Sequence, residues 1–133
     1  MKRKIEISSD CKNFPEVENF LNVIFKEENL SRKLFCKIYL SVSEAVNNAI
    51  LHGNGSDLSK KVKLDYSSDK LALYLTISDE GNGFDISKVV DPTLPHTISN
   101  ESGRGIFIMK KYSDGVDFYE NGKIVRLTFY TKE

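Results

Sequence analysis

A glutamate and an asparagine four residues apart, Glu44 and Asn48, are side chains of this sequence that could do chemistry together. If residues 41–53 are helical, both lie on one helix face, beside the small neighbours Ala45 and Ala49. The asparagine carbonyl suits Mg²⁺, which prefers oxygen ligands, and the carboxylate could orient or deprotonate a nucleophile. Alone, the pair also fits a solvated helix face, so a metal site needs support from elsewhere in the chain.

A second candidate is the acidic turn at 77–85, which begins where an apolar strand is expected to end. Gly81 and Gly83 permit positive φ angles and close approach to a flat ligand. Asp79, held at the end of the strand, could accept a hydrogen bond from an exocyclic amine such as that of adenine. A calcium-like or purely structural acidic turn is the alternative.

The third candidate is Ser102-Gly103-Arg104-Gly105, a glycine-rich turn that is expected to open a helix. Unpaired N–H groups and the dipole at a helix amino terminus favour phosphate, and glycine lets the backbone close around it. The segment lacks the Walker pattern GxxxxGK[ST], and it does not follow a strand as a dinucleotide-binding fingerprint would. By itself it is weak evidence for a phosphate site.

The hydrophobic pattern predicts the elements that would position these motifs. Alternating apolar residues predict strands, and an apolar residue every three or four positions predicts a helix. The predicted strands are 4–8, 62–66, 71–77, about 115–120 and 123–131, and the predicted helices are 15–28, from Asn29 or Ser31 to Gly53, and 105–112. Asn121-Gly122 between the last two strands is a strong hairpin signal.

The order β-α-α-β-β-loop-α-β-β places the strands in adjacent pairs. We therefore expect an α+β fold, a two-layer α/β sandwich whose mixed, mostly antiparallel sheet carries helices on one face. A chain of 133 residues has room for a single domain, 1–133. The long irregular stretch before the last helix, about 86–102, has a length that is usually functional.

Composition excludes several classes of function. Nineteen Lys and Arg balance nineteen Asp and Glu, so no global field attracts nucleic acid or an anionic membrane. The basic start, Met1-Lys2-Arg3-Lys4, runs into an alternating pattern instead of an apolar signal core, and no apolar run approaches the roughly 20 residues that span a bilayer. We expect a cytoplasmic protein without a membrane or a direct nucleic-acid partner.

Taken together, SEAVNNAILHG, DEGNGFD and GRGIFIMKKYSD, in this order and spacing, resemble the motifs of the GHKL or Bergerat-fold ATPases. Within that superfamily a chain this short looks most like the anti-sigma-factor serine kinases of bacterial stress-response and sporulation systems. The resemblance extends from about Ile5 to Phe129. The combination of three motifs is far more specific than any one of them.

The resemblance implies a role for each motif residue. Glu44 matches the general base and Asn48 the Mg²⁺ ligand, while Asp79 matches the acceptor of the adenine amine. The glycines that it places around ATP are Gly81 and Gly83 beside adenine, and Gly103 and Gly105 beside phosphate.

The resemblance also implies a lid over the triphosphate at about 86–102, with Arg104 or Lys88 as phosphate contacts. The sequence departs from the family after Gly122, where threonines that help to hold adenine are often found. Lys123 and Ile124 stand there instead, which puts part of the adenine contacts in doubt.

The function implied by the resemblance is that of an anti-sigma factor with ATP- and Mg²⁺-dependent protein serine kinase activity. Such kinases phosphorylate an anti-anti-sigma antagonist, bind a sigma factor and tend to form homodimers. The alternative is a regulatory module that binds nucleotide to set a partner surface, without phosphoryl transfer. A gyrase-type ATPase would need a transducer domain, and a histidine kinase a phosphoacceptor helix, for which this sequence has no segment left.

Overall fold

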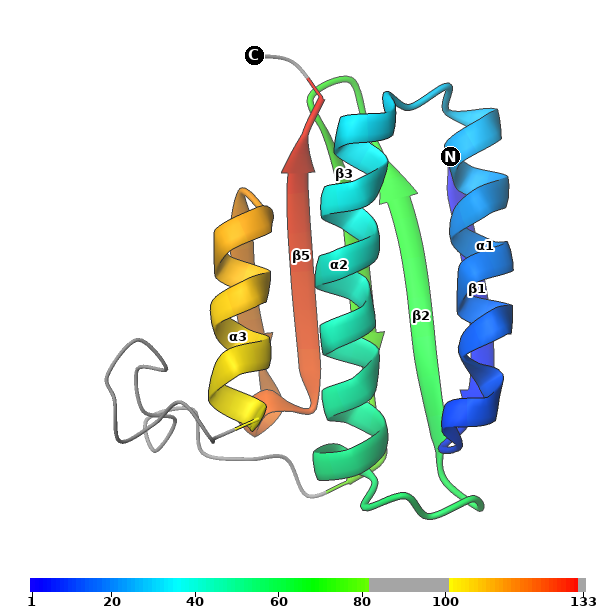
Figure 1. Cartoon of the computed structure of the whole chain (residues 1–133), viewed down its shortest axis with the longest axis vertical. Coiled ribbons are helices and arrows are strands. Elements are labelled where there is room, and N and C mark those ends of the chain that lie inside the picture. The colour runs from blue at the N-terminus through cyan, green and yellow to red at the C-terminus, as the bar shows by residue number, and fades with distance from the viewer. Residues whose placement is uncertain (82–100, 132–133) are drawn as a thin grey trace.

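The computed structural model describes residues 1–81 and 101–131, which form a five-stranded sheet with three α-helices packed on one face (Figure 1). The strands are β1 (Lys2–Ser8), β2 (Lys61–Ser68), β3 (Ala72–Ser78), β4 (Gly115–Tyr119) and β5 (Ile124–Tyr130), in the spatial order β1-β2-β3-β5-β4. All four pairings are antiparallel. The predicted α+β sandwich with its mostly antiparallel sheet is confirmed.

Side-chain alternation separates the two faces of the sheet. In β3, Leu73, Leu75 and Ile77 lie under the helices and are each 1% exposed. The residues between them, Tyr74 and Thr76, lie on the other face, which no described helix covers. In an antiparallel sheet with one buried face, apolar and polar residues alternate along each strand. The strands could therefore be predicted from the sequence.

The turn between β4 and β5 confirms the hairpin predicted at Asn121-Gly122. Asn121 has φ 57° and Gly122 has φ 85°, both in the left-handed region. Glycine reaches this region without steric cost, and asparagine tolerates it better than most residues. The turn brings the start of β5 beside the end of β3, with Ser78 paired to Ile124.

Helix α1 (Phe14–Glu27) begins near Pro15 and buries a stripe of apolar side chains: Val17, Phe20, Leu21 and Ile24. Its carboxyl end is closed by the main chain, because the Leu30 N–H donates to the Phe25 carbonyl over 3.1 Å and Asn29 has φ 53°. Asn29 therefore ends α1. Of the two residues predicted as possible starts of the second helix, Asn29 is not the cap. Ser31 is the cap, since its hydroxyl accepts from the Leu34 N–H at 3.1 Å.

Helix α2 (Arg32–Asn48) continues into a π-helical turn, η2 (Ala49–Gly53). The predicted end at Gly53 is confirmed, but the last five residues are wider than an α-helix. Such turns are rare and are often found at functional sites. The last α-helical residue is Asn48, so the change of geometry falls directly after the predicted metal ligand.

Helix α3 (Glu101–Tyr112) begins four residues before Gly105, where the sequence had predicted its start. Gly103 and Gly105 therefore lie inside the helix, and the prediction of a glycine turn in front of it is wrong. The boundary was hard to place because glycine is unfavourable within a helix. Of the predicted lid, 101 and 102 belong to α3 and 86–100 lie outside the described residues.

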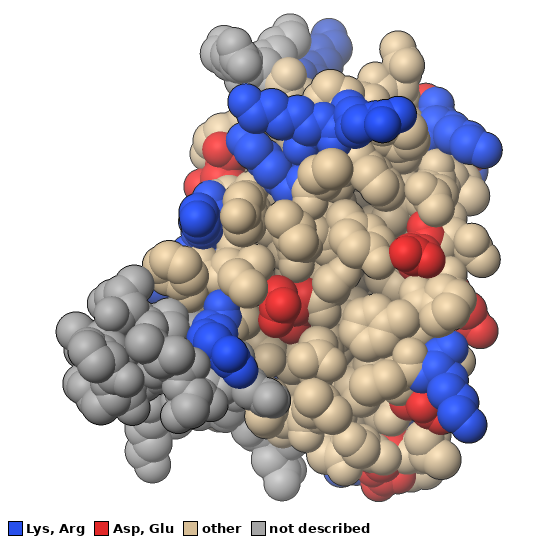
Figure 2. Space-filling view, in the orientation of Figure 1, with Lys and Arg blue, Asp and Glu red and all other residues tan. Residues whose placement is uncertain are grey.

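The core lies between the sheet and the helices. Val42, Val46, Leu127 and Phe129 each have 0% of their surface exposed. On the outer side of the helices, uncharged residues cover most of the middle, and Lys and Arg gather across the end at which α2 begins (Figure 2). Among the described residues no helix is long and apolar enough to cross a membrane.

Replacing Leu127, which is 0% exposed, by alanine should remove core contacts that cannot re-form. We expect Leu127→Ala to lower the free energy of unfolding by about 2–5 kcal/mol, as for other buried leucines. The matched control is Leu71→Ala, because Leu71 is 65% exposed. Urea unfolding followed by circular dichroism measures both; equal losses in the two variants would contradict this description of the core.

Candidate functional site

Asn48 and Asp79, predicted from separate motifs, line one pocket near the end of α2. The lining comes from α2, the π-turn, β3, α3, β4, the β4–β5 turn and β5: Ala45, Asn48, Ala49, Ile77, Asp79, Met109, Phe118, Gly122, Lys123 and Val125. Its walls are mostly apolar, with a few polar groups, as in small-molecule sites. The free volume is about 10 Å³, room for one water molecule, so a flat ring could enter only if lining side chains move.

Gly105 brings the start of α3 against the predicted metal-binding pair. A Cβ atom at Gly105 would lie 3.1 Å from both the Asn48 Nδ2 and the Glu44 Oε2. Asn48 is 8% exposed and Glu44 is half-buried. A larger residue would have to displace both side chains by a few tenths of an ångström. Glu44, Asn48 and the third motif therefore meet at one place.

Asp79 lies in equally close contact with the end of the π-turn. A Cβ atom at Gly53 would lie 2.2 Å from the Asp79 Oδ2, and one at Gly81 would lie 1.6 Å from the Gly53 carbonyl oxygen. The Gly81 N–H donates to the Asp79 Oδ1 at 2.9 Å, and the Asp79 N–H donates to the Lys123 carbonyl at 2.9 Å. The carboxylate is therefore held between two glycines at the end of β3.

Burial raises the pKa of the Asp79 carboxyl above its usual value. The hydrogen bond from the Gly81 N–H and the positive charges of Lys123 and Lys60 act in the opposite direction and only partly offset it. Asp79 is thus a poorly solvated acceptor. A neutral donor can satisfy such a group without the cost of bringing in a second charge.

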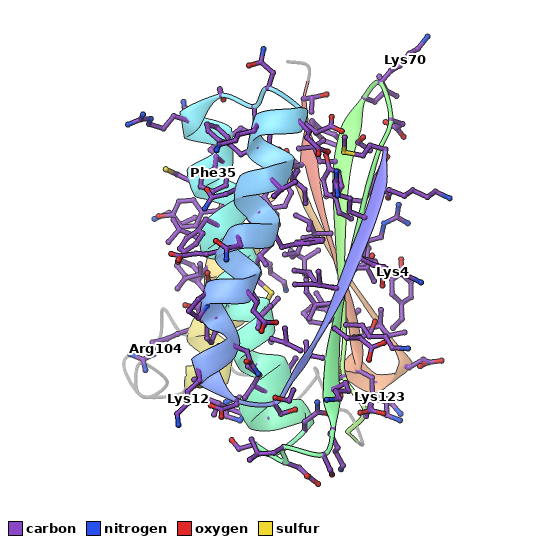
Figure 3. The ribbon with its side chains drawn as sticks, turned by 90° about the vertical axis from the view of Figure 1, so that its right-hand side faces the viewer. Lys4, Lys12, Phe35, Lys70, Arg104 and Lys123 are labelled. Atoms are coloured by element: carbon purple, nitrogen blue, oxygen red, sulfur yellow. The ribbon has the colours of Figure 1, made fainter. Side chains whose placement is uncertain are left out.

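Lys123 belongs to the site although the sequence showed it only as a departure from the family pattern. It lines the same pocket as Asp79 and occupies the turn between β4 and β5 at the end of the sheet (Figure 3). Its charge favours the ionised form of Asp79. A lysine here can influence both the shape and the electrostatics of the pocket.

Asn54 was missed by the sequence analysis. It is 3% exposed, and its side chain bonds to the Glu80 N–H, Ser9 and Lys61. Ser9 and Glu80 are distant from Asn54 in the sequence, so no local pattern indicates that Asn54 is buried. Its neighbour Gly53 was identified only as the residue that ends a helix.

The donor atoms around Asn48 fit a magnesium ion. Among residues 1–81 and 101–131, no three His, Cys, Asp or Glu side chains gather to hold a metal, so any magnesium site would have few protein ligands. Mg²⁺ usually takes one or two protein ligands and completes its shell with water and phosphate oxygens. The nearly buried Asn48 carboxamide, with Glu44 beside it, could supply those protein contacts.

Some predicted site residues either do not line the pocket or lie outside the described residues. Arg104 is exposed, and its side chain extends from the start of α3 away from the sheet (Figure 3). Gly103 lies in the first turn of α3. Gly83 and Lys88 lie outside the described residues. Their assignments remain predictions.

The comparisons with known proteins agree with this geometry. The sequence profile of the histidine kinase-like ATPase domain matches residues 7–129, which include all elements around the pocket. Relatives at 38%, 37% and 35% identity over 92, 92 and 94 residues are named "Anti-sigma F factor", in Bacillus velezensis, Bacillus subtilis and Bacillus thuringiensis.

These alignments include 65%, 65% and 67% of this chain. They span 63%, 63% and 64% of the relatives, so somewhat less than two thirds of each relative is matched.

The raised pKa of Asp79 predicts a pH-dependent stability difference between the wild type and Asp79→Asn. Ionising a buried carboxyl costs folded-state free energy, and this cost is absent below about pH 3.9, where the unfolded residue is also protonated. As the pH rises through the raised pKa, Asp79 ionises in the folded wild type and the protein becomes less stable by this cost. We therefore expect Asp79→Asn to be at least as stable as the wild type at pH 7, with the difference shrinking in acid.

Urea unfolding at several pH values measures this difference, and Asp57→Asn is the control of opposite sign. Hydrogen bonds from Ser59 lower the pKa of Asp57, so its stabilising contribution is present at neutral pH and is lost in acid. Asp57→Asn should be the less stable protein at pH 7. An Asp79→Asn variant that behaves like Asp57→Asn would contradict the assigned environment of Asp79.

Proposed function

The chain belongs to the histidine kinase-like ATPase family, and from this premise we propose that it is an anti-sigma factor that binds ATP with Mg²⁺ and phosphorylates a serine of an anti-anti-sigma antagonist. The observation that carries the proposal is that Asn48 and Asp79 line one pocket, while Gly105 lies against Asn48. The names of the relatives support the regulatory role.

Each residue of the pocket would have one task in binding. Asp79 would accept a hydrogen bond from the exocyclic amine of adenine, while the apolar walls around Ile77 and Met109 would exclude water from the ring. Asn48 would hold the metal through its carbonyl oxygen. When bound, Mg²⁺ would neutralise charge on the phosphates.

Glu44 is the residue that we propose takes part in phosphoryl transfer. In the proposed reaction the serine oxygen bonds to the γ-phosphorus, the bond from that phosphorus to the bridging oxygen of ADP breaks, and the hydroxyl proton passes to the Glu44 carboxylate. Glu44 lies on α2 one turn before Asn48, so the base and the metal ligand share one rigid helix. No covalent enzyme intermediate is required.

The outer surface of the helices supports the proposal that the chain binds other proteins. Each α-helix exposes one large apolar side chain there: Val23 on α1 at 41%, Leu40 on α2 at 43% and Phe107 on α3 at 41%. The net charge of zero gives no general attraction for nucleic acid. A sigma factor and an antagonist protein are the proposed partners, and a second copy of the chain would use the same kind of surface.

Glu44→Gln tests the kinase proposal because it keeps the shape of the side chain and removes its basicity. We expect Mg²⁺-ATP affinity to stay within a few fold and phosphoryl transfer to a purified antagonist to fall by about 10²-fold or more. Transfer of labelled γ-phosphate and calorimetry measure the two quantities. The control is Glu16→Gln, an exposed glutamate on α1, which should transfer phosphate normally.

Equal transfer by Glu44→Gln and the wild type would remove Glu44 as the base. Tight Mg²⁺-dependent ATP binding by the wild type without any phosphorylated product would replace the kinase with a nucleotide-dependent binding module.

Gly105→Ala tests the contact between α3 and the metal-binding pair. The added methyl group would press on Asn48 and Glu44 from 3.1 Å, although alanine favours the helix by about 1 kcal/mol over glycine. We expect weaker Mg²⁺-ATP binding in calorimetry without a comparable loss of stability. Gly115→Ala is the control, because a Cβ atom there would be 3.5 Å from the nearest atom of Thr128, an ordinary contact. Unchanged affinity in Gly105→Ala would contradict the proposed role of this contact.

A further inference from the structure

We propose that Asn54 is a positioning residue for nucleotide binding, which fixes Asp79 relative to Asn48 across the pocket. The inference rests on the proposed ATP site. Asn54 lies outside the three motifs and does not line the pocket; it acts through the turn that follows Asp79.

The Asn54 side chain makes three hydrogen bonds to three separate segments. Its Oδ1 accepts from the Glu80 N–H at 2.8 Å, and its Nδ2 donates to the Ser9 Oγ at 2.8 Å and to the Lys61 carbonyl at 3.0 Å. It thus joins the turn after β3 to the residue after β1 and to the start of β2. A buried amide with all of these bonds made is held in one place.

The partners leave only one orientation for the amide. The Ser9 hydroxyl donates its proton to the Lys60 carbonyl at 2.7 Å, so its oxygen can only accept from Asn54. The Lys61 carbonyl is an acceptor and the Glu80 N–H is a donor. An aspartate here would place carboxylate oxygens against two acceptors, so the position requires both a donor and an acceptor on one side chain.

The Asn54 main chain connects this network to α2. Its N–H donates to the Ala49 carbonyl at 2.8 Å, the bond that closes the π-turn after Asn48. The same residue therefore bonds through its main chain to the helix that carries Asn48 and through its side chain to the turn that carries Asp79. The distance between the two ligand-binding groups depends on it.

The turn that carries Glu80 is constrained on both sides by close contacts and hydrogen bonds. Glu80 lies between Asp79 and Gly81, which both contact Gly53. The Glu80 carboxylate accepts from the Lys61 N–H, so it fixes the turn to β2 beside the Asn54 bond. Without Asn54 the Glu80 N–H would lose its partner, and the turn that carries Asp79 would lose one of the bonds that fix its position.

The test compares Asn54→Ala with Asn13→Ala in binding of ATP and of GTP. Asn13 is a suitable control because its amide also bonds at the end of β1, to the Ser8 carbonyl at 3.1 Å and the Ser8 Oγ at 2.8 Å, without a bond to the Asp79 turn. Both variants should lose stability. We expect only Asn54→Ala to lose about tenfold in ATP affinity and to lose preference for ATP over GTP. Guanine has a carbonyl oxygen at the ring position where adenine has the amine that would donate to Asp79.

The decisive readout is the double variant with Asp79→Asn. If Asn54 acts through Asp79, Asn54→Ala should change ATP affinity by no more than about twofold once Asp79 has been replaced. A full tenfold loss in that background, or equal ATP affinity of Asn54→Ala and the wild type, would overturn the inference. Equal losses in Asn54→Ala and Asn13→Ala would also overturn it, because they indicate general destabilisation.

If Asn54→Ala does not fold, Ser9→Ala serves as the second variant, since it keeps Asn54 and removes the hydroxyl that holds its amide. We expect it to lower ATP affinity and ATP preference in the same direction by a few fold, and unchanged values would overturn the inference. A wild-type protein that does not bind ATP would refute the proposed function itself, and this inference with it.

Discussion

The structure depends on the contact between the end of α2 and the end of β3, which only glycine permits. Gly53 and Gly81 touch so closely that a methyl group on either would overlap its neighbour, and the Asp79 carboxylate is held beside them. Gly105 allows a similar but less tight approach, because a Cβ atom there would lie 3.1 Å from Glu44 and from Asn48. The residues that could act on a ligand therefore come together because small residues stand at both contacts.

The local features of the fold could be predicted from the sequence. Alternation located the five strands since one sheet face is buried, and Ser31 and Asn121-Gly122 marked a helix start and a hairpin. The start of α3 was placed too late because glycine is unfavourable within a helix, and no sequence pattern indicated the π-turn. Asn54 was missed because two of its three side-chain partners, Ser9 and Glu80, are distant in the sequence. Asn48 and Asp79 were proposed from their local motifs and given roles by the resemblance, and only the fold shows that they line one pocket.

The pocket shares part of its wall with the core. Five of its lining residues also belong to the hydrophobic core: Ala45, Ala49, Ile77, Met109 and Val125. Its polar side lies where the π-turn, the turn after β3 and the β4–β5 turn meet. The pocket is narrow, and burial raises the pKa of the Asp79 carboxyl. A ligand with an amine donor would give this carboxyl a hydrogen-bond partner. Lys123, where the family often has threonine, gives this pocket a charge of its own.

The central claim is that a metal-bound nucleotide lies between Asn48, Asp79 and the start of α3. The most direct measurement is an amide NMR spectrum of the protein with ATP and Mn²⁺, a paramagnetic substitute for Mg²⁺ that broadens signals close to it. The account predicts that the signals of Glu44, Asn48 and Gly105 broaden, while those of Asp79 and Gly81 shift on ATP binding with or without the metal. Broadening centred on the uncovered sheet face, for example at Lys63 and Thr76, would contradict it.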